Sequence, residues 1–129
     1  MQTNTFHKSE RISSQRDIDS LFTGGLSFIS YPLRVVYVEK KETETTKPSA
    51  SILISVPKKK FKRAVKRNRV KRLVRESYRL NKHSFLDFLQ ENNKTLLVAF
   101  LFVGDDLPDY KTVEAAVIKA LGKLQEKLA

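Results

Sequence analysis

The residues best suited to do chemistry in this chain are the lysines and arginines between Pro57 and Lys82. This segment holds thirteen of the 25 Lys and Arg residues and only one of the 14 acids, Glu76, so thirteen positive charges and one negative give +12 in a chain whose total is +11. The rest of the chain is therefore close to neutral. Clustered basic side chains attract polyanions, because each can neutralise a phosphate and release its counterions. The segment predicts a polyanion as the partner.

A predicted helix over residues 63–80 would place five of these thirteen basic residues on its outer face. At about 100° per residue, Leu73, Val74 and Ser77 fall within roughly 60° of Val70, and this stripe predicts the side that faces the core. The polar residues that lie opposite this stripe or flank the opposite row are Asn68, Arg69, Lys71, Arg72, Arg75 and Arg79. The spacing therefore separates a face for packing from a face for binding.

An ordinary solvated helix face is the alternative explanation. Solvated faces usually combine Glu with Lys at i, i+4, and here only Glu76 is available. Arginine outnumbers lysine on the outer face, which suits bidentate contacts with phosphates. A membrane-surface helix would also expose a bulky apolar face, whereas this apolar stripe is needed for the core. These patterns favour nucleic acid as the partner.

Arg67 and the residues before the helix leave alternatives open. Arg67 borders the apolar stripe, so we expect its head group either to extend toward solvent or to reach a partner at the helix start. The basic residues that precede the helix are Lys58, Lys59, Lys60, Lys62 and Arg63. They form either a flexible basic loop or, with the backbone N–H groups at the helix start, a second anion site.

Other residues that could carry catalysis or bind a metal are poorly placed for it. Asp105, Asp106 and Asp109 could hold a metal ion for a protein-based nuclease, but acids before a helix more often cap it. His7 and His83 have no Cys or His partner at zinc-site spacing, and the chain has no cysteine. We predict no catalytic residue and no metal site in the protein.

The composition predicts one folded domain over residues 1–129. Hydrophobic residues make up 40% of the chain, which suits a modest core. No apolar run approaches the ~18 residues of a membrane span, and the N-terminus lacks the apolar core of a signal peptide. We therefore expect a cytoplasmic protein without membrane contact, whose residues 1–10 form a flexible arm.

Hydrophobic periodicity predicts three helices and three strands. The predicted helices cover residues 14–23, residues 63–80 and a segment that starts after a cap at Asp109, with one or two further helical turns at residues 85–89. The predicted strands cover residues 28–38, 51–56 and 95–103, and residues 39–50 are expected to form an exposed loop. The order α-β-β-α-β-α indicates an α+β two-layer sandwich with a βαβ unit across residues 51–103.

Residues 66–76 read Lys-Arg-Asn-Arg-Val-Lys-Arg-Leu-Val-Arg-Glu. This segment, entered through a strand, Val56 and a Lys pair, resembles the Arg-Asn-Arg signature of the bacterial ribonuclease P protein component. The size, the short amphipathic segment from Arg11 to Gly25 and the order of elements also agree with that family. The resemblance spans about residues 6–125 and is most specific over residues 56–79. It implies a βαβ crossover of the rare left-handed kind, against the common right-handed rule.

The resemblance also implies a function. Proteins of that family are the small subunit of a ribozyme that removes the 5′ leader from precursor tRNA, in which the RNA subunit cleaves the phosphodiester with Mg²⁺. By this resemblance, the contacts with the RNA subunit are Lys66, Arg67, Asn68, Arg69, Lys71, Arg72, Arg75 and Arg79, with further basic contacts from Lys58, Lys59, Lys60, Lys62 and Arg63. The leader would lie in a cleft between the first helix and the sheet, at Ile18 and Phe22. Stacking of an unpaired base on Phe22 is physically reasonable, but both residues could equally be core.

Two segments depart from the family pattern. Lys60-Phe61-Lys62-Arg63 fills a turn where the family often has a small residue, so the path of residues 57–63 is open. The strand over residues 95–103 lacks the basic residue with which it often ends. A ribosomal-type or other structured-RNA or DNA-binding module is the alternative function, and the flanking strands disfavour a helix-turn-helix DNA reader. The sequence does not predict an oligomeric state.

Overall fold

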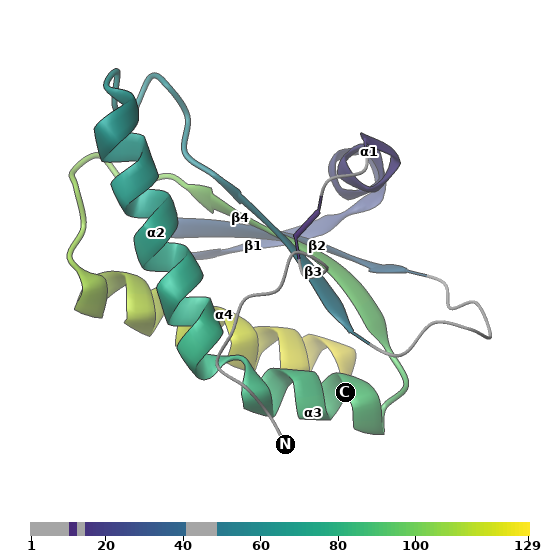
Figure 1. Cartoon of the computed structure of the whole chain (residues 1–129). Coiled ribbons are helices and arrows are strands. Elements are labelled where there is room, and N and C mark those ends of the chain that lie inside the picture. The colour runs from purple at the N-terminus through teal and green to yellow at the C-terminus, as the bar shows by residue number, and fades with distance from the viewer. Residues whose placement is uncertain (1–10, 13–14, 41–48) are drawn as a thin grey trace.

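The computed structural model describes residues 11–12, 15–40 and 49–129 of the chain (Figure 1). It contains a four-stranded sheet in the order β1-β2-β4-β3. The strands are β1 (Leu26–Ser30), β2 (Leu33–Lys40), β3 (Ala50–Ser55) and β4 (Thr95–Phe102), and the helices are α1 (Gln15–Gly24), α2 (Ala64–Asn81), α3 (His83–Glu91) and α4 (Tyr110–Leu128). This architecture confirms the predicted α+β class.

Side chains that alternate along the strands separate two cores, one on each face of the sheet. Val35 and Val98 belong to the larger core, which packs against α2, α3 and α4. Their neighbours Val36 and Leu97 belong to a smaller core with Leu21 of α1. Three helices therefore lie on one side of the sheet and α1 lies on the other (Figure 1).

The predicted strand over residues 28–38 is wrong as a single element. It forms two antiparallel strands, β1 and β2, with Phe28 opposite Val35 and a tight turn at Tyr31 and Pro32. Proline has a fixed φ and no N–H to donate, which suits a turn better than a strand interior. The β-forming residues on both sides of Pro32 hid this reversal. The order along the chain is therefore α-β-β-β-α-α-β-α.

The other predicted elements agree with the structure to within two residues at each end, and the helical turns at residues 85–89 belong to α3. The expected loop over residues 39–50 is wrong at its ends, because residues 39 and 40 belong to β2 and residue 50 belongs to β3. Residues 41–48 of that loop and the expected arm at residues 1–10 lie outside the described residues.

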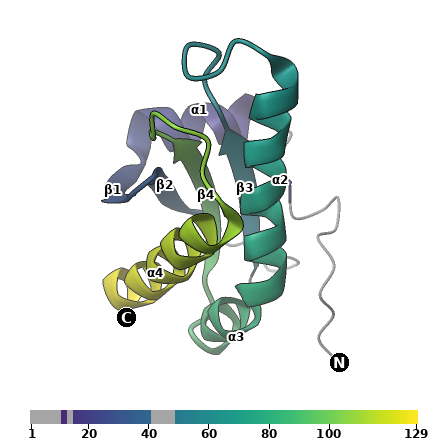
Figure 2. The same ribbon diagram turned by 90° about the vertical axis from the view of Figure 1, so that its left-hand side faces the viewer.

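The βαβ unit is confirmed by the pairing of β3 and β4, which are parallel neighbours joined through α2 and α3. The left-handed sense of this crossover stays a prediction. Since β3 is an edge strand, α2 runs beside the edge of the sheet (Figure 2). The position of α2 matters because it carries seven of the thirteen basic residues between Pro57 and Lys82.

Gly25 lets α1 end directly against the sheet. Its N–H donates to the carbonyl oxygen of Leu21 at 3.0 Å. A Cβ at residue 25 would lie 2.2 Å from that oxygen and 2.9 Å from Cγ1 of Val36, whereas a Cβ at Gly24 would meet nothing within 4 Å. The distance between α1 and β2 therefore depends on a residue without a side chain at position 25.

Replacing Gly25 with Ala should lower the free energy of unfolding by about 1–3 kcal/mol, because the new methyl group clashes with backbone and core atoms that have little room to move. Gly24→Ala is the matched control and should leave stability unchanged or raise it slightly. Urea denaturation of both variants measures the difference. Equal effects at the two positions would contradict the close approach of α1 to β2.

Candidate nucleic-acid interface

The apolar stripe of α2 packs as the sequence predicts. Val70, Val74 and Ser77 are at most 1% exposed, and Tyr78 joins them. Tyr78 stacks at a tilt against Phe100 of β4, with ring centroids 6.3 Å apart. This packing fixes the rotation of α2 about its own axis, so the residues on the opposite side must face away from the sheet.

The exposed polar residues of α2 form an outer row of Lys66, Asn68, Arg69 and Arg72. Within the described part of the chain, none of these four side chains makes a hydrogen bond or an ion pair. The first turn of α2 contains no acid, and Arg63 at its N-cap makes no capping hydrogen bond through its side chain. The outer row and the uncapped helix start together present positive charge to solvent, which suits phosphate groups.

Arg67 has a structural role. Its guanidinium donates hydrogen bonds to the carbonyl oxygens of Phe61 and Lys62, both at 2.7 Å. The sequence left two options for Arg67, and the structure selects the one in which it reaches a partner at the helix start. This contact shapes the turn that leads into α2.

The turn over residues 57–63, which the sequence left open, is held by two further contacts. The ring of Phe61 packs against Phe102 of β4 with centroids 5.7 Å apart, and Lys60 forms an ion pair with Asp105 at 3.1 Å. The remaining basic residues of this segment, Lys58, Lys59, Lys62 and Arg63, are exposed. The turn is therefore anchored to the fold while most of its charge faces outward.

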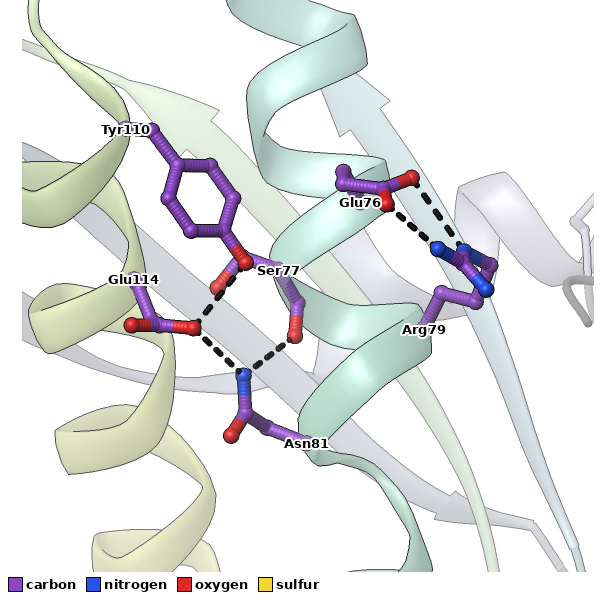
Figure 3. A network of polar contacts seen from close by, with 6 residues as sticks. All are labelled: Glu76, Ser77, Arg79, Asn81, Tyr110 and Glu114. Carbon is purple, nitrogen blue, oxygen red and sulfur yellow. Dashed lines mark hydrogen bonds and ion pairs between the residues drawn. The ribbon is translucent and has the colours of Figure 1, made fainter. Parts of the chain in front are cut away.

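Arg79 pairs with Glu76 one helical turn away (Figure 3). Its Nε donates to Oε2 of Glu76 at 3.2 Å, and a second guanidinium nitrogen donates to Oε1. These hydrogen bonds lower the pKa of Glu76, and the same contact raises the pKa of Arg79. The pair is fully charged near neutral pH, so Arg79 is less available to a phosphate than the sequence suggests.

The C-terminal end of α2 is tied to α4 through Glu114 (Figure 3). One carboxylate oxygen of Glu114 accepts from the hydroxyl of Tyr110 at 2.9 Å and from the amide of Asn81 at 3.3 Å. The amide of Asn81 also donates to the backbone oxygen of Ser77 at 2.8 Å. Burial, followed by the hydrogen bond to Glu114, raises the pKa of Tyr110. This network helps to hold α2 in place against α4.

Lys71 and Arg75 lie on the flank of α2 nearest β3, where both are half-buried. They line a hollow at the edge of the sheet together with Arg11. The sequence assigned both residues to the basic face but had no means to associate them with Arg11, which is sixty residues away in the chain.

A second hollow lies between α1 and the sheet, with a volume of about 230 Å³. Its lining includes Phe22, whose side chain is 53% exposed, and Arg34. Ile18, the other predicted cleft residue, is not part of this lining and packs against the smaller core. The structure therefore separates the two residues, with Phe22 at the hollow and Ile18 against the core. Arg34 was missed because its place on the cleft face follows only from the pairing of β1 and β2.

Two acids of the loop before α4, Asp105 and Asp109, have ordinary structural roles. Asp109 caps α4 by accepting a hydrogen bond from the N–H of Thr112 at 2.8 Å, and hydrogen bonding to the side chain and then to the backbone of Thr112 lowers the pKa of Asp109. Asp105 pairs with Lys60. No group of three or more potential metal ligands occurs among the described residues, and no helix in this part of the chain has the length and apolar composition of a membrane span.

Comparison with known proteins gives consistent matches over most of the chain. A family model described as Ribonuclease P matches residues 6–125. The ribonuclease P protein component of Porphyromonas gingivalis is 53% identical over 114 residues, which cover 88% of this chain and 82% of that protein. The component from Chlorobium phaeobacteroides is 30% identical over 110 residues, covering 81% and 75% of the two chains.

Two solved structures share the fold. The RNase P protein from Thermotoga maritima aligns with a TM-score of 0.68 and 23% identity over 88% of this chain and 96% of that chain. The Staphylococcus aureus RNase P protein gives a TM-score of 0.66 at 23% identity over 91% and 95% of the two chains. These similarities show that the overall fold is a known architecture.

Arg67→Ala should lower the free energy of unfolding by about 1–3 kcal/mol even without RNA, because two backbone carbonyl groups lose a charged donor. Arg72→Ala, on the exposed row of the same helix, is the matched control and should change stability by less than about 0.5 kcal/mol. Urea denaturation of the protein alone measures both values. Equal stability of the two variants would rule out the structural role of Arg67.

Proposed function

The chain belongs to the ribonuclease P protein family, and we propose that α2 and the hollow beside α1 are the surfaces through which it performs the family's role. As a ribonuclease P protein component, it is part of the holoenzyme that removes 5′ leaders from precursor tRNA. Its partners are accordingly the ribonuclease P RNA and precursor tRNA.

The outer face of α2 is the proposed contact with the RNA subunit. This proposal is supported by the exposure of Lys66, Asn68, Arg69 and Arg72, whose side chains make no hydrogen bond or ion pair within the described part of the chain. Such side chains can bind phosphates without first breaking an internal bond. Lys58, Lys59, Lys62 and Arg63 extend the same charge to the helix start. Arg67 and Arg79 contribute mainly by shaping the helix and its turn.

Catalysis is expected from the RNA subunit, with Mg²⁺ held mainly by RNA. Two of the loop acids, Asp109 and Asp105, are used in a cap and an ion pair, and no group of three or more potential metal ligands occurs among the described residues. The protein would act by bringing positive charge close to the RNA phosphates, which lowers their mutual repulsion. Precursor tRNA is processed in the bacterial cytoplasm, and we place the protein there.

The hollow between α1 and the sheet is the proposed site of the 5′ leader. Phe22 offers an exposed ring at its lip, and an aromatic ring can stack on any unpaired base. Arg34 adds a cation on the same face, where its guanidinium donates to the hydroxyl of Ser27 at 3.4 Å. An aromatic platform beside a cation suits single-stranded RNA. The alternative of a ribosomal-type protein is disfavoured by the matches to ribonuclease P proteins.

The function is tested by cleavage of a precursor tRNA with the cognate ribonuclease P RNA at low Mg²⁺. Adding the protein should accelerate release of the leader, whereas the protein alone should release none. Polylysine at matched positive charge is the control for unspecific neutralisation and should stimulate less. A lack of stimulation would refute the proposed function, and cleavage by the protein alone would refute catalysis by RNA.

Phe22→Ala should weaken binding of the holoenzyme to leader-bearing precursor tRNA by about 1–3 kcal/mol, the usual contribution of one stacked base. Binding of mature tRNA, which has no leader, should stay the same. The matched control is Ile118→Ala, because Ile118 is also exposed but lies on α4, across the sheet from α1. Equal losses with precursor and mature tRNA would place Phe22 outside the leader site.

A further inference from the structure

A hollow at the outer edge of the sheet, separate from the one beside Phe22, combines a basic rim with an apolar floor. Its volume is about 200 Å³. The rim is formed by Arg11, Lys71 and Arg75, and the floor includes Ile12, Ile52 and Ile54. No acidic residue is part of the lining. Lys71 and Arg75 lie one helical turn apart without an acid in the lining, so their charges repel each other and a bound anion would relieve this repulsion.

Arg11 reaches this hollow because the chain before α1 adds to the edge of the sheet. Arg11 forms a parallel bridge with Ile52, and the N–H of Ile12 donates to the carbonyl oxygen of Ile52 at 3.0 Å. Ile12 itself is only 8% exposed. The backbone contact and the buried neighbour together hold residue 11 at β3, opposite the basic flank of α2.

Lys71 and Arg75 are prepared for a ligand on the other side of the hollow. Neither makes a hydrogen bond or an ion pair within the described residues. Their backbone is held firmly, because the buried residues Val70 and Val74 precede them in the same helix. Their place on α2 is therefore set by the core and not by a partner for their charge.

The hollow also connects the two faces of the sheet. Along the edge strand β3, Ile54 packs with the core below α2, whereas the neighbouring Leu53 packs with the core below α1. Both line the hollow. A strand of RNA that passes from the outer face of α2 toward the α1 side of the sheet would cross it.

We propose that this hollow binds one phosphodiester group of an RNA strand, with Arg11, Lys71 and Arg75 as its ligands and the attached ribose over the isoleucine floor. Arginine suits the phosphate because its planar fork can contact two oxygens at once. The site deepens the proposed function and rests on it. It adds Arg11, a residue far from the basic segment in the chain, to the RNA-binding surface.

The phosphate could come from the catalytic RNA or from the 5′ leader, and two binding measurements distinguish these sources. The first is the affinity of the protein for the catalytic RNA. The second is the affinity of the assembled holoenzyme for precursor tRNA and for mature tRNA. The variant is Arg11→Ala, and the matched control is Arg16→Ala, an exposed arginine on α1 outside the hollow.

Arg11→Ala should weaken one of these affinities about tenfold, as expected for the loss of a charged hydrogen-bonded contact, whereas Arg16→Ala should change each by less than about twofold. A loss confined to the catalytic RNA assigns the phosphate to that RNA, and a loss confined to leader-bearing precursor assigns it to the leader. The same small effect for Arg11→Ala and Arg16→Ala in both measurements would overturn the proposal. Arg11→Lys, which keeps the charge and the backbone bridge, should restore part of the affinity.

Neutral methylphosphonate linkages at single positions of the assigned strand give the second measurement. One position should weaken binding of the original protein but have no further effect on Arg11→Ala, because the contact is already lost. If no position shows this dependence, Arg11 does not bind a phosphate and the proposal fails. Stimulated cleavage by the original protein would remain in that case, so the failure of this site is distinct from a failure of the proposed function.

Discussion

The burial of one side of α2 is the constraint on which the rest of the structure depends. Val70, Val74 and Ser77 are almost completely buried, and they fix the rotation of a helix that carries much of the protein's excess charge. Because these side chains face the sheet, Asn68 and Arg72 must face solvent. The basic side chains on this helix repel each other, and the burial of the apolar residues offsets this repulsion and keeps the helix in place.

Two groups of basic residues in the segment differ in their contacts. Arg67, Arg79 and Lys60 make internal contacts with the turn, with Glu76 and with Asp105. These contacts stabilise the helix and its entry. The exposed members of the outer row make none within the described part of the chain, so their charge is left for a partner. A count of charges along the sequence gives the total but does not separate these groups.

Local patterns were sufficient to predict much of the fold and part of the site. The helix over residues 64–81 follows from the spacing of its apolar residues, and the Asp109 cap follows from its place before a helix. The reversal at Tyr31 and Pro32 was missed because β-forming residues lie on both sides of it. The convergence of Arg11 with Lys71 and the place of Arg34 in the hollow depend on strand pairing, which joins residues distant in the chain. Periodicity within one element carries no such information.

In the proposed complex, the outer face of α2 binds phosphates of the catalytic RNA. The most direct measurement is the salt dependence of that binding for the original protein and for a variant with both Arg69 and Arg72 changed to Ala. If both side chains neutralise phosphates, the slope of log affinity against log salt should fall by about 1.4 to 1.8, which corresponds to two lost contacts. Arg16→Ala should leave the slope unchanged. An unaltered slope in the double variant would show that Arg69 and Arg72 do not contact phosphates of the catalytic RNA.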